Sequence, residues 1–173
     1  MAIALTDFSG FCGFRPLPQI VNFLKTVPEF AAVVGDSAAS SFISAVESAP
    51  SKLVERSPPA ELPSSEYADL QNALRKLFSA LMEADPEKTV KPNLRKLVER
   101  YQKETGKKES KEMKFGTIEE LVVRLNEQFP DDVGAFCSYL LNVVELKKGE
   151  AVFLKANEPH AYLSGGESHI FIQ

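Results

Sequence analysis

Apolar side chains recur at helical spacing through most of this 173-residue chain. Ile20, Phe23, Leu24 and Val27 stand at i, i+3, i+4 and i+7, which is the pattern of an amphipathic helix with one face in a core. The later stripes are Ala39, Phe42, Ile43 and Val46; Tyr67, Leu70, Leu74, Leu77, Phe78 and Leu81; Val90, Leu94, Leu97, Val98 and Tyr101; Ile118, Leu121, Val122, Leu125 and Phe129; and Val133, Phe136, Leu140 and Val143. We therefore expect a helical domain over residues 17–144, with about five or six helices.

Local signals mark where these helices start and stop. Pro18 suits a first helical turn, where its missing N–H costs nothing. Thr117 and Glu120 fit a capping box that starts a helix. Residues 48–65 hold four prolines and several serines, which predicts a linker. The mixed-sign charges of residues 103–114 predict a solvated loop.

An N-terminal strand segment precedes the helices. Met1–Leu5 is a short apolar run and is expected to be a buried strand. A loop is expected at Ser9–Gly10, and Phe11–Phe14 reads as a second strand. Residues 1–16 are thus expected to belong to a sheet.

A second strand segment follows the helices, over residues 145–165. Lys147–Glu150 reads as a tight turn, and Ala151–Leu154 as a short apolar strand. Pro159 then interrupts the strand, because proline donates no backbone hydrogen bond. The fold class expected from the whole pattern is mostly α with a few β-strands.

His160 and Tyr162 are the candidate site residues. Positions two apart in an extended segment point to the same side, so both rings can face one cavity. A turn, a strand and then a histidine is an arrangement by which small cupin-type barrels present a metal ligand. A lone histidine is more often structural, Tyr162 packs in a barrel just as readily, and neighbouring Glu158 is expected to be a solvated carboxylate.

Composition excludes several classes of function. The formal net charge is −4, and no segment is strongly basic, so binding to nucleic acid is not expected. Cys12 and Cys137 lie among apolar neighbours and are expected to be buried free thiols in a reducing compartment. The apolar runs are too short to span a bilayer, and Met1–Leu5 does not have the pattern of a signal peptide. The expected location is the cytoplasm.

Two segments of the chain resemble one known family. Ala151–Gly165 is similar to the histidine segment of the zinc-dependent type I mannose-6-phosphate isomerases, also called phosphomannose isomerases. Met1–Phe8 and Gly10–Pro16 look like an earlier segment of the same family. The two segments occur in the family's order, with a helical insert between them.

The resemblance implies a domain organisation. Residues 1–16 correspond to a strand segment of a cupin-type β-barrel, and residues 17–144 to a helical domain inserted into that barrel. Residues 145–165 correspond to a barrel strand that carries the metal histidine. The match ends at about Gly166, so residues 166–173 form a divergent tail.

The resemblance also implies an activity. The family interconverts mannose 6-phosphate and fructose 6-phosphate through an enediol, in mannose metabolism and GDP-mannose biosynthesis, with zinc as a Lewis acid. Its zinc is held by two histidines, a glutamine and a glutamate, and His160 falls on one of the histidines. Tyr162 is the candidate pocket residue. The other three ligands precede the segment that matches Met1, so we expect this chain alone neither to retain zinc nor to isomerise sugar phosphates.

Two alternatives stay open beside the isomerase hypothesis. In the first alternative, the chain is a non-catalytic helical interaction module or a regulatory isoform fragment. The reason to consider it is that apolar strands such as Met1–Leu5 and Ala151–Leu154 need partners. Without partners these strands invite self-association, unless they pair with each other. The second, an unrelated small cupin, is disfavoured because the sequence offers only three or four candidate strands.

Overall fold

The computed structural model describes residues 2–51, 67–105, 116–154, 158–165 and 167–169. The chain divides into two compact units, one made of Pro16–Leu140 and the other of Met1–Arg15 with Leu141–Gln173. Most of the expected linker and most of the expected charged loop lie outside the described residues. No helix in the described ranges is long and apolar enough to cross a membrane.

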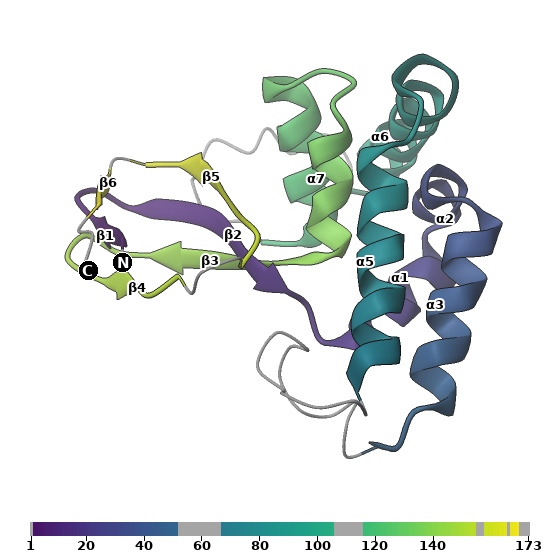
Figure 1. The fold of residues 1–173 in the computed structure, drawn as a ribbon. Helices are drawn as coiled ribbons and strands as arrows, with labels where there is room; N and C mark the ends of the chain where they lie inside the picture. Colours follow the sequence, from purple (N-terminus) through teal and green to yellow (C-terminus); the bar gives the residue numbers. More distant parts are fainter. Residues whose placement is uncertain (1, 52–66, 106–115, 155–157, 166, 170–173) are drawn as a thin grey trace. The chain divides into compact units, whose positions relative to one another are not determined.

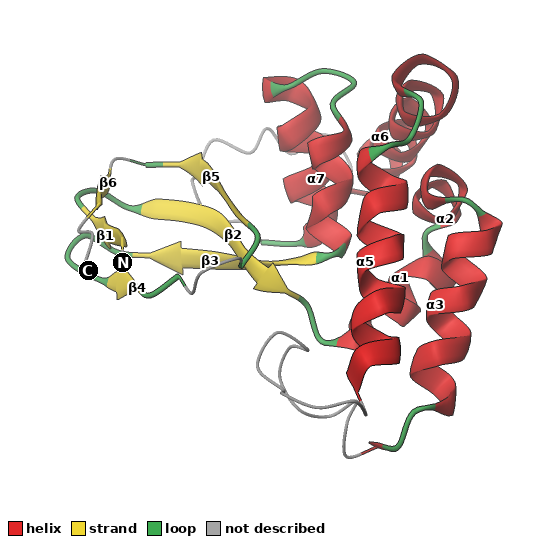
Figure 2. Cartoon of the chain, in the orientation of Figure 1, coloured by secondary structure: helices red, strands yellow, loops and turns green. Residues whose placement is uncertain are grey.

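The unit Pro16–Leu140 is helical (Figures 1 and 2). In it, α3 packs beside α5, α6 packs beside α7, and α2 contacts both α5 and α6. In chain order the described elements are α1 (Leu17–Thr26), α2 (Pro28–Val34), α3 (Asp36–Ser48), α5 (Ala68–Met82), the π-helical turn η3 (Pro86–Val90), α6 (Lys91–Thr105), α7 (Ile118–Gln128) and the 3-10 helix η4 (Val133–Tyr139).

The local signals in the sequence account for several of these helix boundaries. The hydroxyl of Thr117 accepts a hydrogen bond from the Glu120 N–H at 3.2 Å, so the expected cap at the start of α7 is confirmed. Pro18 lies in the first turn of α1. Most residues of the apolar stripes lie in the core, in which the ring centroids of Phe30 and Tyr139 lie 5.1 Å apart. The expectation for Phe129 is wrong, because this residue follows α7 and is 59% exposed. Phe30, Phe42, Phe136, Tyr139, Leu77, Leu94 and Leu121 are among the fully buried side chains.

Two pairs of polar side chains contribute to this core. Arg100 donates from Nε and Nη2 to the two carboxylate oxygens of Glu29, at 3.2 and 2.7 Å, and Glu29 is only 2% exposed. The hydroxyls of Tyr101 and Tyr139 lie 2.8 Å apart. Buried polar groups are tolerated where they find such partners.

The other unit is built of strands from both ends of the chain. One sheet has the order β4-β1-β6 and the other β3-β2-β5, and all the recorded pairings are antiparallel. β2 lies between β3 and β5 (Figure 1). The strands are β1 (Ala2–Ala4), β2 (Phe8–Phe14), β3 (Leu141–Leu146), β4 (Ala151–Val152), β5 (His160–Ser164) and β6 (Glu167–His169).

The expected loop at Ser9–Gly10 is wrong. Both residues lie inside β2, opposite Glu145 and Val144 of β3. A Cβ atom at Gly10 would lie 2.9 Å from the carbonyl oxygen of Ala161. The glycine here permits two backbones to approach closely, and so it marks a strand interior rather than a turn.

The last expected helix is also wrong at its C-terminal end. The expected stripe extends to Val143, but η4 ends at Tyr139 and β3 starts at Leu141. Leu141–Leu146 pairs with β2, and this long-range pairing decides between helix and strand for a short apolar run. The expected domain limit at residue 144 therefore falls inside a strand.

The strands expected to lack partners are paired. Ala2 and Ile3 of β1 face Val152 and Ala151 of β4, and β1 also pairs with β6. The alternative in which the two apolar segments pair with each other is thus the correct one. The expected strand Ala151–Leu154 is shortened to its first two residues, and the tail contributes β6. The expected fold class, mostly α with a few strands, is confirmed.

Candidate functional site

His160 and Tyr162 lie on β5, which pairs with β2. In the register His160 faces Cys12 and Tyr162 faces Gly10. The centroids of the His160 and Tyr162 rings lie 6.0 Å apart, as expected of residues two apart on a strand. Tyr162 packs edge-on against Phe8 at 5.5 Å and is still 41% exposed. The tyrosine therefore both packs on the sheet and borders the exposed histidine.

A backbone contact fixes the orientation of the His160 ring. Its Nδ1 atom lies 2.9 Å from the carbonyl oxygen of Glu158. A carbonyl oxygen can only accept a hydrogen bond, so Nδ1 carries the proton in the neutral ring. The lone pair is then left on Nε2. An imidazole held in this way has the donor arrangement of a metal-ligating histidine.

Glu158 is half-buried. Its carboxylate comes close to β2, where a Cβ atom on Gly13 would lie 2.6 Å from Oε1. Burial, and secondly the charge of Glu158, raise the pKa of the Cys12 thiol above its usual value. Cys12 therefore stays protonated, and hence weakly nucleophilic, at neutral pH.

Both cysteines are free thiols, as expected. Cys137 is buried as expected, whereas Cys12 is half-buried. Burial raises the pKa of Cys137 to about 12, with a smaller contribution from the charge of Asp132. A thiol in such surroundings is inert. Cys137 is therefore a core residue of the helical unit.

Sequence reasoning missed a β-bulge beside the histidine. The register of β2 with β3 shifts between Phe11 and Phe14, and Gly13 has a φ of +66°. Asn142 of β3 donates from Nδ2 to the carbonyl oxygen of Phe14 at 2.7 Å. A glycine inside an expected strand and a polar asparagine beside it were the available signals.

The described residues do not complete a zinc centre. In the ranges that the structure describes, no three or more His, Cys, Asp or Glu residues are grouped to hold a metal ion. Structural and catalytic zinc sites in proteins use at least three protein ligands. The ring of His160 therefore has the orientation of a zinc ligand, but the described residues around it do not supply enough further ligands to hold a zinc ion.

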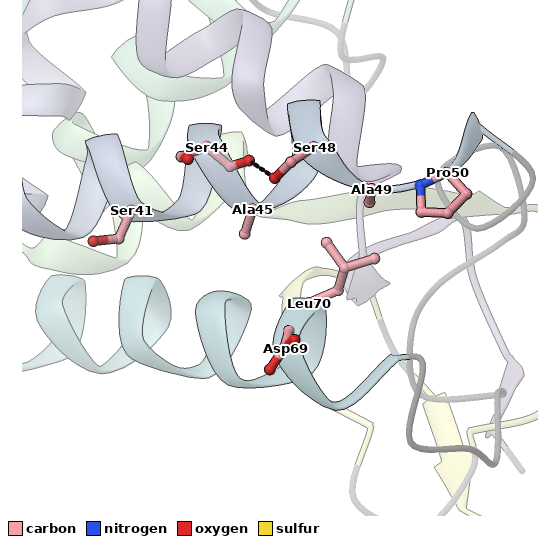
Figure 3. A pocket seen from close by; sticks show the side chains of 8 residues that line it. All are labelled: Ser41, Ser44, Ala45, Ser48, Ala49, Pro50, Asp69 and Leu70. Carbon is pink, nitrogen blue, oxygen red and sulfur yellow. Dashed lines mark hydrogen bonds between the residues drawn. The ribbon is translucent and has the colours of Figure 1, made fainter.

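A separate groove of about 520 Å³ lies in the helical unit, between α3 and the start of α5 (Figure 3). It is lined by Ser41, Ser44, Ala45, Ser48, Ala49, Pro50, Asp69 and Leu70. The hydroxyl of Ser48 donates to the carbonyl oxygen of Ser44 one turn earlier. Among the described residues that line the groove, Asp69 is the one titratable group, so these residues do not supply the pair of groups that acid–base chemistry needs.

Comparison with known proteins identifies relatives of both units. Residues 33–141 match the model of the phosphomannose isomerase type I helical insertion domain. The chain is 43% identical over 166 residues to the mannose-6-phosphate isomerase of Candida albicans, covering 95% of this chain and 34% of that protein. The human mannose-6-phosphate isomerase is 41% identical over 165 residues, with 95% and 34% covered. The chain thus spans about a third of the length of the curated relatives it matches.

Solved structures of the same kind of enzyme also resemble this chain. A zinc-bound mannose 6-phosphate isomerase superposes with a TM-score of 0.63 at 28% identity, covering 96% of this chain and 32% of that one. The Salmonella typhimurium enzyme, solved with its substrate fructose 6-phosphate and zinc, gives a TM-score of 0.61 with the same identity and the same coverage. The family model covers more than half of the chain. The chain therefore belongs to the type I phosphomannose isomerase family and contains its helical insertion domain.

Proposed function

We propose that this chain is part of a zinc-dependent mannose-6-phosphate isomerase, which interconverts mannose 6-phosphate and fructose 6-phosphate. The relatives that align with 95% of the chain carry this name, and one structural relative holds fructose 6-phosphate and zinc. The two sheets would belong to a cupin-type barrel, and the helices to an insert in it. A cytoplasmic location, where free thiols such as Cys12 and Cys137 persist, and a role in GDP-mannose biosynthesis are parts of the proposal.

His160 is the residue we propose as a zinc ligand, and Tyr162 as its neighbour in the substrate pocket. The observation that carries the proposal is the 2.9 Å contact from His160 Nδ1 to the Glu158 carbonyl, because it leaves Nε2 for a ligand. A zinc ion held by His160 together with further ligands would supply Lewis-acid chemistry to an oxygen of the sugar.

A chimera tests the role of His160. The part of this chain that aligns with the Candida albicans relative replaces the corresponding segment of that enzyme, and His160→Asn is introduced. We expect loss of zinc and of isomerase activity, because the asparagine amide is a poor zinc ligand. Lys148→Gln, an exposed change in the turn before β4, is the control and should retain both. A His160→Asn chimera that keeps a full zinc complement would overturn the assignment.

We further propose that the chain by itself neither retains zinc nor isomerises sugar phosphates. The support is that His160 stands without two further grouped ligands in the described ranges. The measurement is zinc content after purification in zinc-containing buffer, together with the coupled isomerase rate. Near-stoichiometric zinc, or turnover that a chelator abolishes, would contradict this.

A non-catalytic role through self-association is the second candidate. Leu5, just after β1, is 52% exposed, and Phe153, just after the paired strand β4, is 66% exposed. Exposed large apolar side chains on one unit favour association with another surface. Light scattering over a range of concentrations decides, because a monomer at all of them counts against this role.

A further inference from the structure

We propose that Gly13 and Asn142 are positioning residues for the imidazole of His160. The proposal concerns how His160 is oriented, and its relevance to zinc binding rests on the function proposed above. Neither residue forms a hydrogen bond with the imidazole. They act through the short segment Glu158–Pro159, which precedes β5 and provides the carbonyl oxygen that holds Nδ1.

The first link joins the bulge to this segment. The N–H of Gly13 donates to the carbonyl oxygen of Pro159 at 2.9 Å. Gly13 can point its N–H this way because its φ is +66°, a conformation that L side chains rarely adopt. A side chain at this position would also meet the Glu158 carboxylate, since Oε1 lies 2.6 Å from the place of a Cβ. Backbone and space therefore both require glycine here.

The second link holds the bulge from the neighbouring strand. Asn142 Nδ2 donates to Phe14 O at 2.7 Å and lies 3.4 Å from the carbonyl oxygens of Cys12 and Gly13. A bulge leaves ladder groups unpaired, and one side-chain amide here serves three consecutive carbonyls. β2 lies between β3 and β5 (Figure 1), so a support on β3 is transmitted through β2 to the segment before β5.

The consequence is a fixed tautomer. As long as the Glu158 carbonyl is held in place, the neutral ring keeps its proton on Nδ1 and presents Nε2. If the bulge relaxes, the segment Glu158–Pro159 moves and the exposed ring is free to turn. The ring then exchanges between tautomers as in an unstructured peptide. Ligand geometry at such a site depends on this outer layer of contacts.

The experiment reads the tautomer directly, on the full chain and without metal. His160 and His169 are the two histidines, and His169→Gln leaves a single imidazole. Long-range nitrogen–proton NMR at about pH 9, where free imidazole is neutral, reports which nitrogen carries the proton. We expect mainly the Nδ1–H form, and a ratio of Nδ1–H to Nε2–H that falls about fivefold in Asn142→Ala and in Gly13→Ala.

A matched control separates positioning from backbone strain. Gly149 lies in the same unit with a φ of +90°, and no atom lies within 4 Å of a Cβ placed there. Gly149→Ala likewise places a side chain at a positive φ and is expected to leave the tautomer ratio unchanged. Adding Glu158→Ala to Gly13→Ala removes the clashing carboxylate and keeps the backbone carbonyl. We expect it to restore much of the ratio.

The outcomes are distinct. Folded Asn142→Ala with an unchanged ratio overturns the inference, and this variant decides if Gly13→Ala does not fold. A change in Gly149→Ala equal to that in Gly13→Ala also overturns it, since strain alone would then be the cause. The zinc content of the chimera tests the proposed function separately. A His160→Asn chimera that keeps its zinc leaves the tautomer result standing while removing its functional meaning.

Discussion

One carboxylate, that of Glu29, lies almost fully buried in the helical unit. Burial by itself raises its pKa, but hydrogen bonds from Arg100 and from its own backbone, with the charges of Arg100 and Lys96, bring the net pKa below its usual value. Arg100 also stacks on Tyr101, with Cζ 4.9 Å from the ring centroid. This ion pair joins α2 to α6. A buried charge whose partner is removed is strongly destabilising.

We therefore expect Arg100→Met to lower the free energy of unfolding by about 2–3 kcal/mol. Methionine keeps the apolar stem of the side chain but leaves Glu29 without its guanidinium. The measurement is urea unfolding of the full chain at neutral pH. Lys103→Met is the control on the same helix, because it removes the exposed pair Lys103–Glu99 and should change stability much less than Arg100→Met does. Equal effects of the two changes would contradict the prediction.

The pH dependence of the same pair has a defined sign. The folded-state pKa of Glu29 lies below the unfolded one, so the ionised carboxylate stabilises the fold above the unfolded pKa, and this contribution disappears as the pH falls through the folded pKa. Glu29→Gln does not titrate at this position. We expect the stability difference between the unmodified chain and Glu29→Gln to shrink between about pH 6 and pH 3. Unfolding curves at several pH values test this, and a constant difference would exclude it.

Among the elements, α7 depends on its cap. The Thr117 hydroxyl satisfies the Glu120 N–H, one of the donors that a helix start leaves without a partner. We expect Thr117→Ala to destabilise the helical unit by about 1 kcal/mol and Thr117→Ser to have little effect, since serine retains the oxygen. Thermal unfolding followed by far-UV circular dichroism measures both. A serine variant as unstable as the alanine variant would mean that the methyl group, not the hydroxyl, matters.

Elements differ in how far the sequence predicts them. α1, α3, α5, α6 and α7 follow apolar stripes whose residues lie within a few positions of one another, and α7 also follows its expected cap. β3 does not, because its first residues extend the apolar pattern of η4 and only pairing with β2 makes them a strand. The same pairing places Ser9–Gly10 inside β2. Short apolar runs are ambiguous until their partner is known.

The whole molecule consists of one continuous unit and one discontinuous unit. Pro16–Leu140 is a single stretch with its own buried core, whereas the sheet unit joins residues from both ends of the chain. We expect Pro16–Leu140, expressed alone, to fold as a helical protein, because its core side chains are supplied within the stretch. Circular dichroism and cooperative urea unfolding test this. A fragment without helical signal would show that the stretch needs the sheet unit.

The sequence alone determined the helical domain, the cap of α7, the turn before β4 and the family resemblance. It also singled out His160 and Tyr162, whose shared face follows from their spacing. These features depend on residues a few positions apart, whose geometry the backbone periodicity fixes. Only the tertiary structure decided the extent of β2 and β3, the pairing of β1, the bulge at Gly13 and the orientation of the His160 ring. The physical reason is sequence separation: Asn142 and Phe14 are 128 positions apart, and no local pattern encodes a hydrogen bond between residues that meet only when the sheet has formed.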